Sequence, residues 1–110
     1  MYKQGDIIVV HFPFSDNIKK SKMRPAIVIS NEISNNIDHD LIICPITTML
    51  RRSVFSFLLD NGDLHEPLPQ NSEVRCNKIA TIRSNLVLSK ISELSKDKMD
   101  DLIGLVKRAF

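Results

Sequence analysis

The chain has 110 residues, of which 43% are hydrophobic and 25% are charged, and its formal net charge is +2. This balance is close to the average for globular proteins and excludes intrinsic disorder, coiled coils and collagen-like repeats. No apolar run approaches the roughly 20 residues that cross a bilayer, and the first residues lack the pattern of a signal peptide. We therefore expect a single domain over residues 1–110, a cytoplasmic location and no contact with a membrane.

Four short apolar runs in the first half of the chain predict β-strands, because they are rich in β-branched and aromatic residues and are bounded by turn residues. These runs cover residues 7–12, 25–30, 41–46 and 54–59. Pro67 and Pro69 then predict an irregular segment. Residues 73–79 predict a strand with one face open to solvent or ligand, and residues 89–94 predict a last short strand.

The C-terminal segment is the one clear helix in the sequence. Ser95 stands where an N-cap is expected, and Met99, Leu102, Ile103 and Val106 recur at the spacing of one helical face. Five or six short strands followed by one helix predict a mostly β, α+β fold. The expected architecture is a small, strongly curved antiparallel barrel with a C-terminal helix.

The sequence lacks the common patterns of metal and nucleotide chemistry. His11, His39 and His65 are scattered, and no HExxH, CxxC, glycine-rich phosphate loop or GxSxG motif is present. We interpret His11 as an ordinary strand residue and His39 as a loop residue. Cys44 and Cys76 lie in separate apolar stretches, which favours buried free thiols over a disulfide or half of a metal site. We therefore expect no cofactor and no metal.

Positive charge is concentrated locally although the whole chain is nearly neutral. The two basic groups are Lys19, Lys20, Lys22 and Arg24, and the pair Arg51 and Arg52. Such a patch attracts phosphate, although a solvated turn has the same composition. Arg24 lies between the basic loop and a buried strand, where its fork of donors can bind a phosphate. The alternative is a surface arginine that ends a strand.

Two further polar groups follow or occupy predicted strands. They are the pair Thr47 and Thr48, and the set Arg75, Asn77 and Lys78. A threonine hydroxyl and its backbone N–H at a strand end can face the same ligand. Arg75 would bring a second guanidinium toward Arg24 if the sheet curls.

Five blocks of the sequence, in order, resemble those of the MazF/PemK toxins of bacterial toxin-antitoxin modules. They are GDIIVVHFP at 5–13, RPAIVISN at 24–31, CPITT at 44–48, SEVRCNKIATI at 72–82 and KISEL at 90–94, before the terminal helix. The resemblance covers nearly the whole chain. It implies a homodimeric, SH3-like barrel of the CcdB/MazF/PemK type.

The resemblance also implies an activity and its residues. The expected toxin is a metal-independent, sequence-specific endoribonuclease that cuts single-stranded RNA, chiefly mRNA, and is inhibited by an antitoxin laid across the RNA groove. The family's active-site arginine and threonine match Arg24 and Thr47, and an arginine of the PemK branch matches Arg75. The remaining expected RNA-binding residues are Lys19, Lys20, Lys22, Thr48, Asn77 and Lys78.

The chain departs from the family pattern at several positions. Asn77 stands where the PemK branch has an aspartate proposed as the base, and an amide cannot accept a proton at neutral pH. The base is therefore open between an RNA-bound water, Thr47 and a carboxylate such as Glu73. Ala80 and Leu86 replace arginines found in relatives.

Two other interpretations compete with the ribonuclease. The first is a catalytically weak or inactive barrel that acts as a binding module on a protein or nucleic acid, as the fold-related gyrase poisons act on a protein. The second is a barrel in which these residues have only structural roles. The presence of both Arg24 and Thr47 favours the enzyme, whereas Asn77 favours the binding module.

Overall fold

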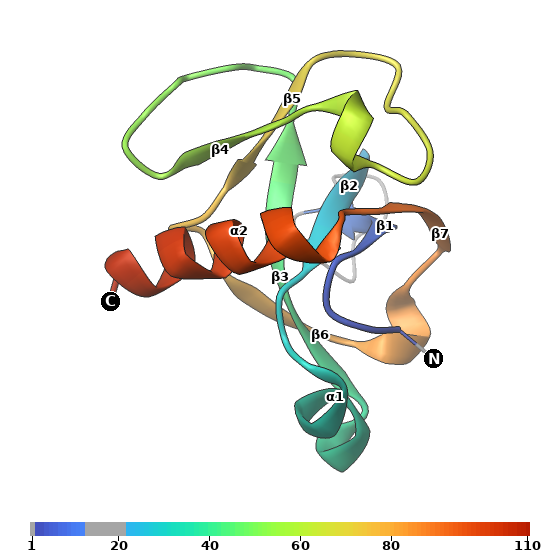
Figure 1. Cartoon of the computed structure of the whole chain (residues 1–110). Coiled ribbons are helices and arrows are strands. Elements are labelled where there is room, and N and C mark those ends of the chain that lie inside the picture. Colours follow the sequence, from blue (N-terminus) through green and yellow to red (C-terminus); the bar gives the residue numbers. More distant parts are fainter. Residues whose placement is uncertain (1, 13–21) are drawn as a thin grey trace.

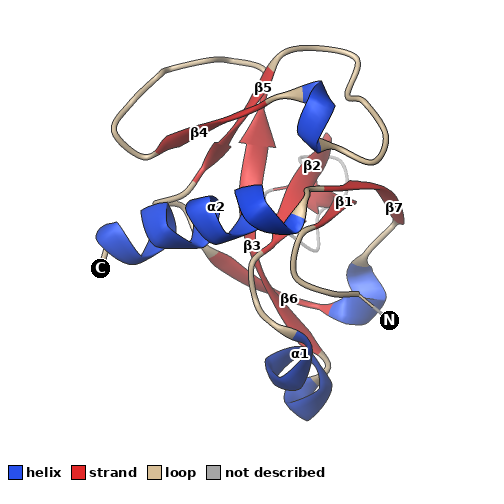
Figure 2. Cartoon of the chain, in the orientation of Figure 1, coloured by secondary structure: helices blue, strands red, loops and turns tan. Residues whose placement is uncertain are grey.

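The computed structural model describes residues 2–12 and 22–110, whose strands form one curled antiparallel sheet (Figure 1). The strands are β1 Asp6–Phe12, β2 Lys22–Val28, β3 Asp40–Thr47, β4 Ser56–Leu59, β5 Ser72–Arg75, β6 Ala80–Arg83 and β7 Ser89–Glu93. The helices are α1 Glu32–Asp38 and α2 Lys96–Arg108, with 3₁₀ turns at Asn61–Asp63 and Ser84–Leu86. Figure 2 shows α2 lying across the sheet, so the predicted mostly β fold with a C-terminal helix is confirmed.

Strand β3 is the centre of the sheet, whose order is β4-β5-β3-β2-β1-β7, with β6 also paired to β3. Its first half, Asp40 to Ile43, pairs with β6, whereas Ile46 and Thr47 pair with β5. Pro45 lies between these two ladders. A proline has no N–H to donate to a neighbouring strand, so it is tolerated where the ladder changes partner. The sheet divides at this point, and β5 and β6 leave β3 separately.

Two hydrophobic cores cover opposite faces of the sheet. One contains Ile7, Ile27, Ile46, Val74 and the buried face of α2, and the other contains Ile8, Val10, Ala26, Val28, Leu41, Ile43 and Ile82. Neighbouring residues such as Ile7 and Ile8 belong to different cores because side chains alternate across a strand. Burial on both faces explains why the strands appear in the sequence as continuous apolar runs.

Helix α2 packs on the first core as its spacing predicts. Met99, Leu102 and Val106 are buried, and Ile103 packs against the same cluster. Ser95 occupies the N-cap position, although its side chain makes no capping hydrogen bond. In the described part of the chain, no helix is both long and apolar enough to span a bilayer.

Replacement of Gly104 by alanine is expected to stabilise the protein. A Cβ at this exposed helical position would meet no other atom within 4 Å. Alanine should therefore raise the free energy of unfolding by about 0.5–1 kcal/mol, measured by equilibrium denaturation with urea. The contrasting variant is Gly5→Ala, since Gly5 has a φ of +97° and its Cβ would lie 3.3 Å from the Leu94 carbonyl oxygen. A loss of stability in Gly104→Ala would contradict the packing of α2 described above.

Helix α1 is the first correction to the sequence-based assignment, which expected only the C-terminal helix. The Asn31 side chain caps the helix by accepting from the Ser34 N–H at 3.0 Å, and His39 ends it with a left-handed φ of 57°. The one buried residue of the helix is Asn35, which hydrogen-bonds to Ser30 and to the Tyr2 carbonyl. A polar residue therefore holds α1 against the sheet, and apolar periodicity does not reveal it.

The second correction concerns residues 73–79, which do not form one half-exposed strand. Strand β5 ends at Arg75, a turn follows, and β6 is a separate strand paired with β3. Ser72, Glu73 and Val74 are all buried. The fourth apolar run also begins later than predicted, because residues 54–55 form a turn before β4.

The two thiols lie inside the protein as predicted. Cys44 and Cys76 are both free and fully buried. Burial raises the pKa of each thiol to about 12, and for Cys44 the neighbouring Cys76 adds to the effect. Neither group is a thiolate at neutral pH, so both contribute to the fold as small apolar side chains.

Candidate functional site

A hollow with a volume of about 300 Å³ lies beside the start of β2 and the segment that leads into β5. We call it the Arg24 hollow. Its lining residues are Val9, Met23, Arg24, Pro25, Thr48, Leu68, Pro69, Gln70, Ser72 and Ile91. Arg24 and Thr48, both predicted to bind the substrate, thus line the same hollow although they come from different strand ends.

The register of β2 and β3 puts Arg24 and Thr47 at the same end of the two strands. The ladder pairs Ile27 with Cys44 and ends where Ala26 pairs with Pro45. Arg24 lies two residues beyond this end of the ladder on β2, and Thr47 lies two residues beyond it on β3, so each side chain projects to the same face as its neighbour Ala26 or Pro45. Directly opposite residues of antiparallel strands project from the same face of the sheet. The fold therefore brings the predicted active-site pair to one end of one sheet face.

The two members of this pair differ in exposure. Arg24 is exposed, whereas Thr47 is half-buried. The Thr47 hydroxyl accepts a hydrogen bond of 3.1 Å from the backbone N–H of Met49. This bond leaves the hydroxyl proton of Thr47 available for donation to a ligand.

Arg75 lies at the end of β5 on the same sheet face as Thr47. Thr47 pairs with Glu73, and Arg75 follows Glu73 by two residues, so their side chains project to one side. Arg75 is half-buried, and its Nε atom is buried without a hydrogen-bond partner in the part of the chain that the structure describes. It does not line the Arg24 hollow.

Glu73 is completely buried between these residues and the β3–β4 loop. Its Oε1 atom accepts from the backbone N–H groups of Arg51 at 2.9 Å and Arg52 at 3.1 Å, and its Oε2 atom accepts from the Ser56 hydroxyl. Burial by itself raises the pKa of Glu73, but these hydrogen bonds and the charge of Arg75 outweigh it and hold the pKa below its usual range. A buried carboxylate that already accepts three hydrogen bonds is poorly placed to take a proton from a ligand in the hollow.

The comparisons with known proteins identify the family. A model described as PemK-like, MazF-like toxin of type II toxin-antitoxin system matches residues 3–110. The chain belongs to the PemK/MazF toxin family. No sequence among the curated proteins matches it.

Solved structures of MazF toxins share the fold of this PemK/MazF toxin. An endoribonuclease in complex with its cognate antitoxin from a mycobacterial species has a TM-score of 0.79 at 16% identity, over 99% of this chain and 94% of that chain. The Mycobacterium tuberculosis toxin MazF-mt6 has a TM-score of 0.76 at 21% identity, over 96% and 95%. A MazE-MazF structure from Deinococcus radiodurans has a TM-score of 0.77 at 17% identity, over 97% and 94%.

The remaining predicted RNA-binding residues of the toxin are spread around the site. Lys22 is the exposed first residue of β2, and Lys19 and Lys20 lie outside the described residues. Asn77 and Lys78 are exposed in the turn after β5 and do not line the Arg24 hollow. The structure therefore brings Arg24 and Thr48 to one hollow, whereas Thr47, Asn77 and Lys78 do not line it.

Sequence reasoning missed the part of the hollow that residues 68–70 line. Leu68 is buried, and the Asn61 side chain bonds both its N–H, at 3.0 Å, and its carbonyl oxygen, at 3.3 Å. These bonds fix the segment that places Pro69 and Gln70 in the lining. The sequence offered one signal, which is Leu68 between two prolines. An apolar residue in a segment that cannot form a strand indicates that the segment is held by packing of its side chain and not by strand pairing.

The described residues also bear on metal binding. Across residues 2–12 and 22–110, no cluster of three or more histidine, cysteine, aspartate or glutamate side chains could hold a metal ion.

Proposed function

We propose that this toxin is a metal-independent endoribonuclease that cleaves single-stranded RNA, chiefly mRNA, at specific short sequences. The observation that carries the proposal has two parts: Arg24 and Thr47 project from one sheet face at the end of the β2–β3 ladder, and Arg24 and Thr48 line an open hollow. Membership of the PemK/MazF family supports it, as does the likeness to proteins described as endoribonucleases.

The proposed reaction is attack of a ribose 2′-OH on the adjacent phosphorus, which forms a 2′,3′-cyclic phosphate and expels the 5′-oxygen of the next nucleotide. The protein must stabilise the anionic phosphorane between these states. Arg24 binds two phosphoryl oxygens through its fork of donors, and the Thr47 hydroxyl donates to one of them. Arg75 adds positive charge from the same face of the sheet.

Proton transfer is assigned to water and Thr47. A guanidinium has a pKa above about 12, so neither arginine is an efficient proton donor, and a water protonates the leaving oxygen. Because Glu73 is buried and Asn77 is an amide, an RNA-bound water or Thr47 takes the 2′-OH proton.

The proposed partners of the toxin are a second copy of the chain and a cognate antitoxin. The mycobacterial neighbour is described as bound to its cognate antitoxin, and the Deinococcus structure is a MazE-MazF complex. Met23, Leu68 and Ile91 give the Arg24 hollow apolar walls that suit the side chains of an extended antitoxin segment. An antitoxin in this position would exclude RNA from Arg24. We place this toxin, as a homodimer, in the cytoplasm.

One observation favours a second candidate function. Asn77 replaces the acid proposed as a base in the PemK branch, which suits a binding module without catalytic activity.

Incubation of the purified toxin with a long single-stranded RNA in excess EDTA separates the two candidates. The enzyme is expected to leave fragments with 2′,3′-cyclic phosphate and 5′-hydroxyl ends, and the same sequence held in a duplex should resist cleavage, because its bases are paired and stacked. Intact RNA at high protein excess would reject the ribonuclease and favour the binding module.

A further inference from the structure

One buried carboxylate fixes the loop between β3 and β4. We call residues 48–55 the arginine loop, because they carry Arg51 and Arg52. The Glu73 carboxylate accepts the N–H groups of both arginines, at 2.9 and 3.1 Å, and also the hydroxyl of Ser56 at the start of β4. The loop is thus tied to β5 by backbone hydrogen bonds, and its arginine side chains are not used in the attachment.

The backbone of the arginine loop is held in an uncommon conformation. Arg52 has a φ of 49°, in the left-handed region that costs a non-glycine residue about 1 kcal/mol or more. Ser53 adds a second attachment, because its N–H donates to the Ser56 hydroxyl at 3.0 Å. This geometry persists because Glu73 and Ser56 together hold it.

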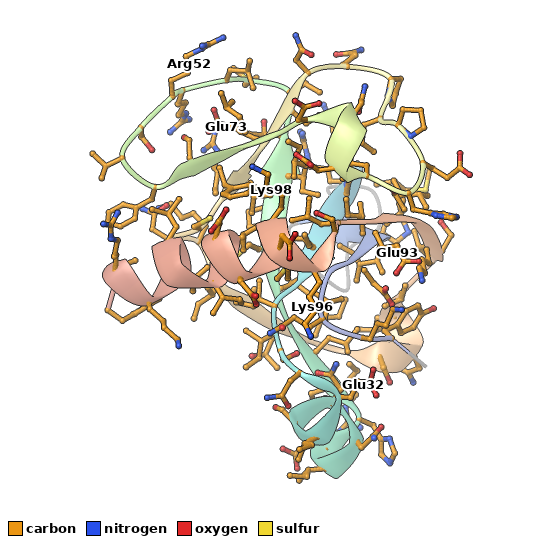
Figure 3. All side chains as sticks on the ribbon, viewed as in Figure 1. Glu32, Arg52, Glu73, Glu93, Lys96 and Lys98 are labelled. Carbon is orange, nitrogen blue, oxygen red and sulfur yellow. The ribbon has the colours of Figure 1, made fainter. Side chains whose placement is uncertain are left out.

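The arginine side chains are free to meet a ligand. Both are exposed, and neither takes part in an ion pair within residues 2–12 and 22–110. In Figure 3, Glu73 lies inside the arc of the loop, whereas Arg52 projects outward from it. The Glu73 carboxylate therefore binds the loop backbone, while the guanidinium groups of Arg51 and Arg52 are exposed to solvent.

The arginine loop borders two hollows. Thr48 lines the Arg24 hollow, and Arg52 lines a second hollow of about 420 Å³. Ser72 lines both, so the two hollows are neighbours. The second hollow also contains Asp60, whose carboxylate accepts the Gly62 N–H at 2.9 Å. A chain of nucleotides leaving Arg24 past Ser72 would meet the loop arginines.

We propose that Glu73 is a positioning residue that holds the arginine loop so that Arg51 and Arg52 bind backbone phosphates of the RNA strand whose scissile phosphate lies at Arg24. The inference rests on the proposed ribonuclease function and extends it to nucleotides outside the cleaved step. Glu73 touches no RNA and acts through the two N–H groups that it binds.

The first test measures how RNA binding depends on salt. The probe is a random-sequence 2′-O-methyl RNA oligonucleotide, which cannot be cleaved because its attacking hydroxyl is blocked. The logarithm of the binding constant falls linearly with the logarithm of the salt concentration. Removal of one arginine–phosphate ion pair should reduce the size of this negative slope by about 0.7 for a single strand. We expect Arg51→Ala/Arg52→Ala to reduce the slope by about 0.7–1.4. The control, Arg83→Ala/Arg108→Ala, removes the same charge from exposed positions on β6 and α2 and should keep the parental slope.

The second test addresses Glu73 itself. Glu73→Leu removes the acceptor for both loop N–H groups, and it should reproduce the reduced slope and speed hydrogen exchange at Arg51 and Arg52. Glu73→Gln keeps one oxygen for these groups and should retain most of the slope. Should Glu73→Leu not fold, Ser56→Ala removes one of the two attachments and should show a smaller change of the same kind. A merely structural role for Glu73 would lower the melting temperature and leave the salt slope of the folded protein unchanged.

The outcomes separate this inference from the function on which it rests. A parental slope in the Arg51→Ala/Arg52→Ala variant, with normal binding by the parent, would overturn the arginine–phosphate interactions alone. A parental slope and parental exchange rates in folded Glu73→Leu would overturn the positioning role. Failure of the parent toxin to bind the probe at any salt concentration would overturn the inference, whereas the proposed ribonuclease is overturned only by intact RNA in the cleavage assay.

Discussion

Arg24→Ala is expected to slow RNA cleavage by about 10²–10³-fold without unfolding the toxin. The guanidinium is proposed to bind the phosphoryl oxygens as negative charge develops on them, and loss of one such donor typically costs this much in rate. Arg24 is exposed near the start of β2 and lies outside both hydrophobic cores, so its removal leaves the packing intact. Single-turnover kinetics give the rate, and circular dichroism with a thermal melt gives the folded state.

Two further variants make this result specific. Arg24→Lys keeps the charge but loses the bidentate fork, so it should recover only part of the rate. Arg83→Ala removes an exposed arginine of β6 and should leave cleavage at the parental rate. Full activity in Arg24→Ala, or a variant that no longer folds, would show that Arg24 has been assigned the wrong role.

Acid is expected to destabilise the toxin partly through Glu73. Its hydrogen bonds and the charge of Arg75 hold the folded pKa below the value of about 4.3 in an unfolded chain. Between these two pKa values the unfolded chain binds more protons. The stabilisation from Glu73 is therefore complete above about pH 5 and is lost as the pH falls through the folded pKa. Urea unfolding between pH 7 and pH 3 should show this decline.

The contribution of Glu73 is isolated by comparison with Glu73→Gln, which has no proton to gain. Its free energy of unfolding should be lower than that of the parent at pH 7, by about 1–3 kcal/mol for the weakened buried bonds, and should fall less steeply in acid. Glu66→Gln removes an exposed carboxylate and is the matched control. Parallel pH profiles for Glu73→Gln and the parent would mean that Glu73 does not titrate with folding.

Much of the fold was predictable because burial leaves a pattern in the sequence. Strands β1 and β3 are covered on both faces, so each appears as a continuous apolar run of the right length. The stripe of Met99, Leu102 and Val106 predicted both α2 and the face that it buries. These elements are determined by hydrophobic burial, which a single sequence records directly.

Helix α1 was not predictable in the same way. Its isoleucines, Ile33 and Ile37, are 75% and 71% exposed, whereas its buried residue is Asn35. The apolar side chains of the helix therefore face solvent. The hydrogen bonds that hold the helix join Asn35 to Ser30 and Tyr2, which precede the helix in the chain. The capping side chain of Asn31 was the available local signal.

The candidate site was predictable only in its residue types. The resemblance to the family selected Arg24 and Thr47, but their common position at one end of the β2–β3 ladder follows from the register. Glu73 appeared as one of several candidate bases, since a sequence does not show that a carboxylate is fully buried and bound by two N–H groups and a hydroxyl. The available sequence signal was the position of Glu73 within a predicted strand, next to the apolar Val74.

Arg24 and Thr47 are proposed to act together at one phosphate, and a double-mutant cycle on the cleavage rate tests this most directly. Groups that stabilise the same transition state are strongly non-additive. We therefore expect Arg24→Ala/Thr47→Ala to cleave RNA little more slowly than Arg24→Ala alone, although Thr47→Ala slows the parent markedly. Rate losses that simply multiply in the double variant would contradict a shared phosphate site.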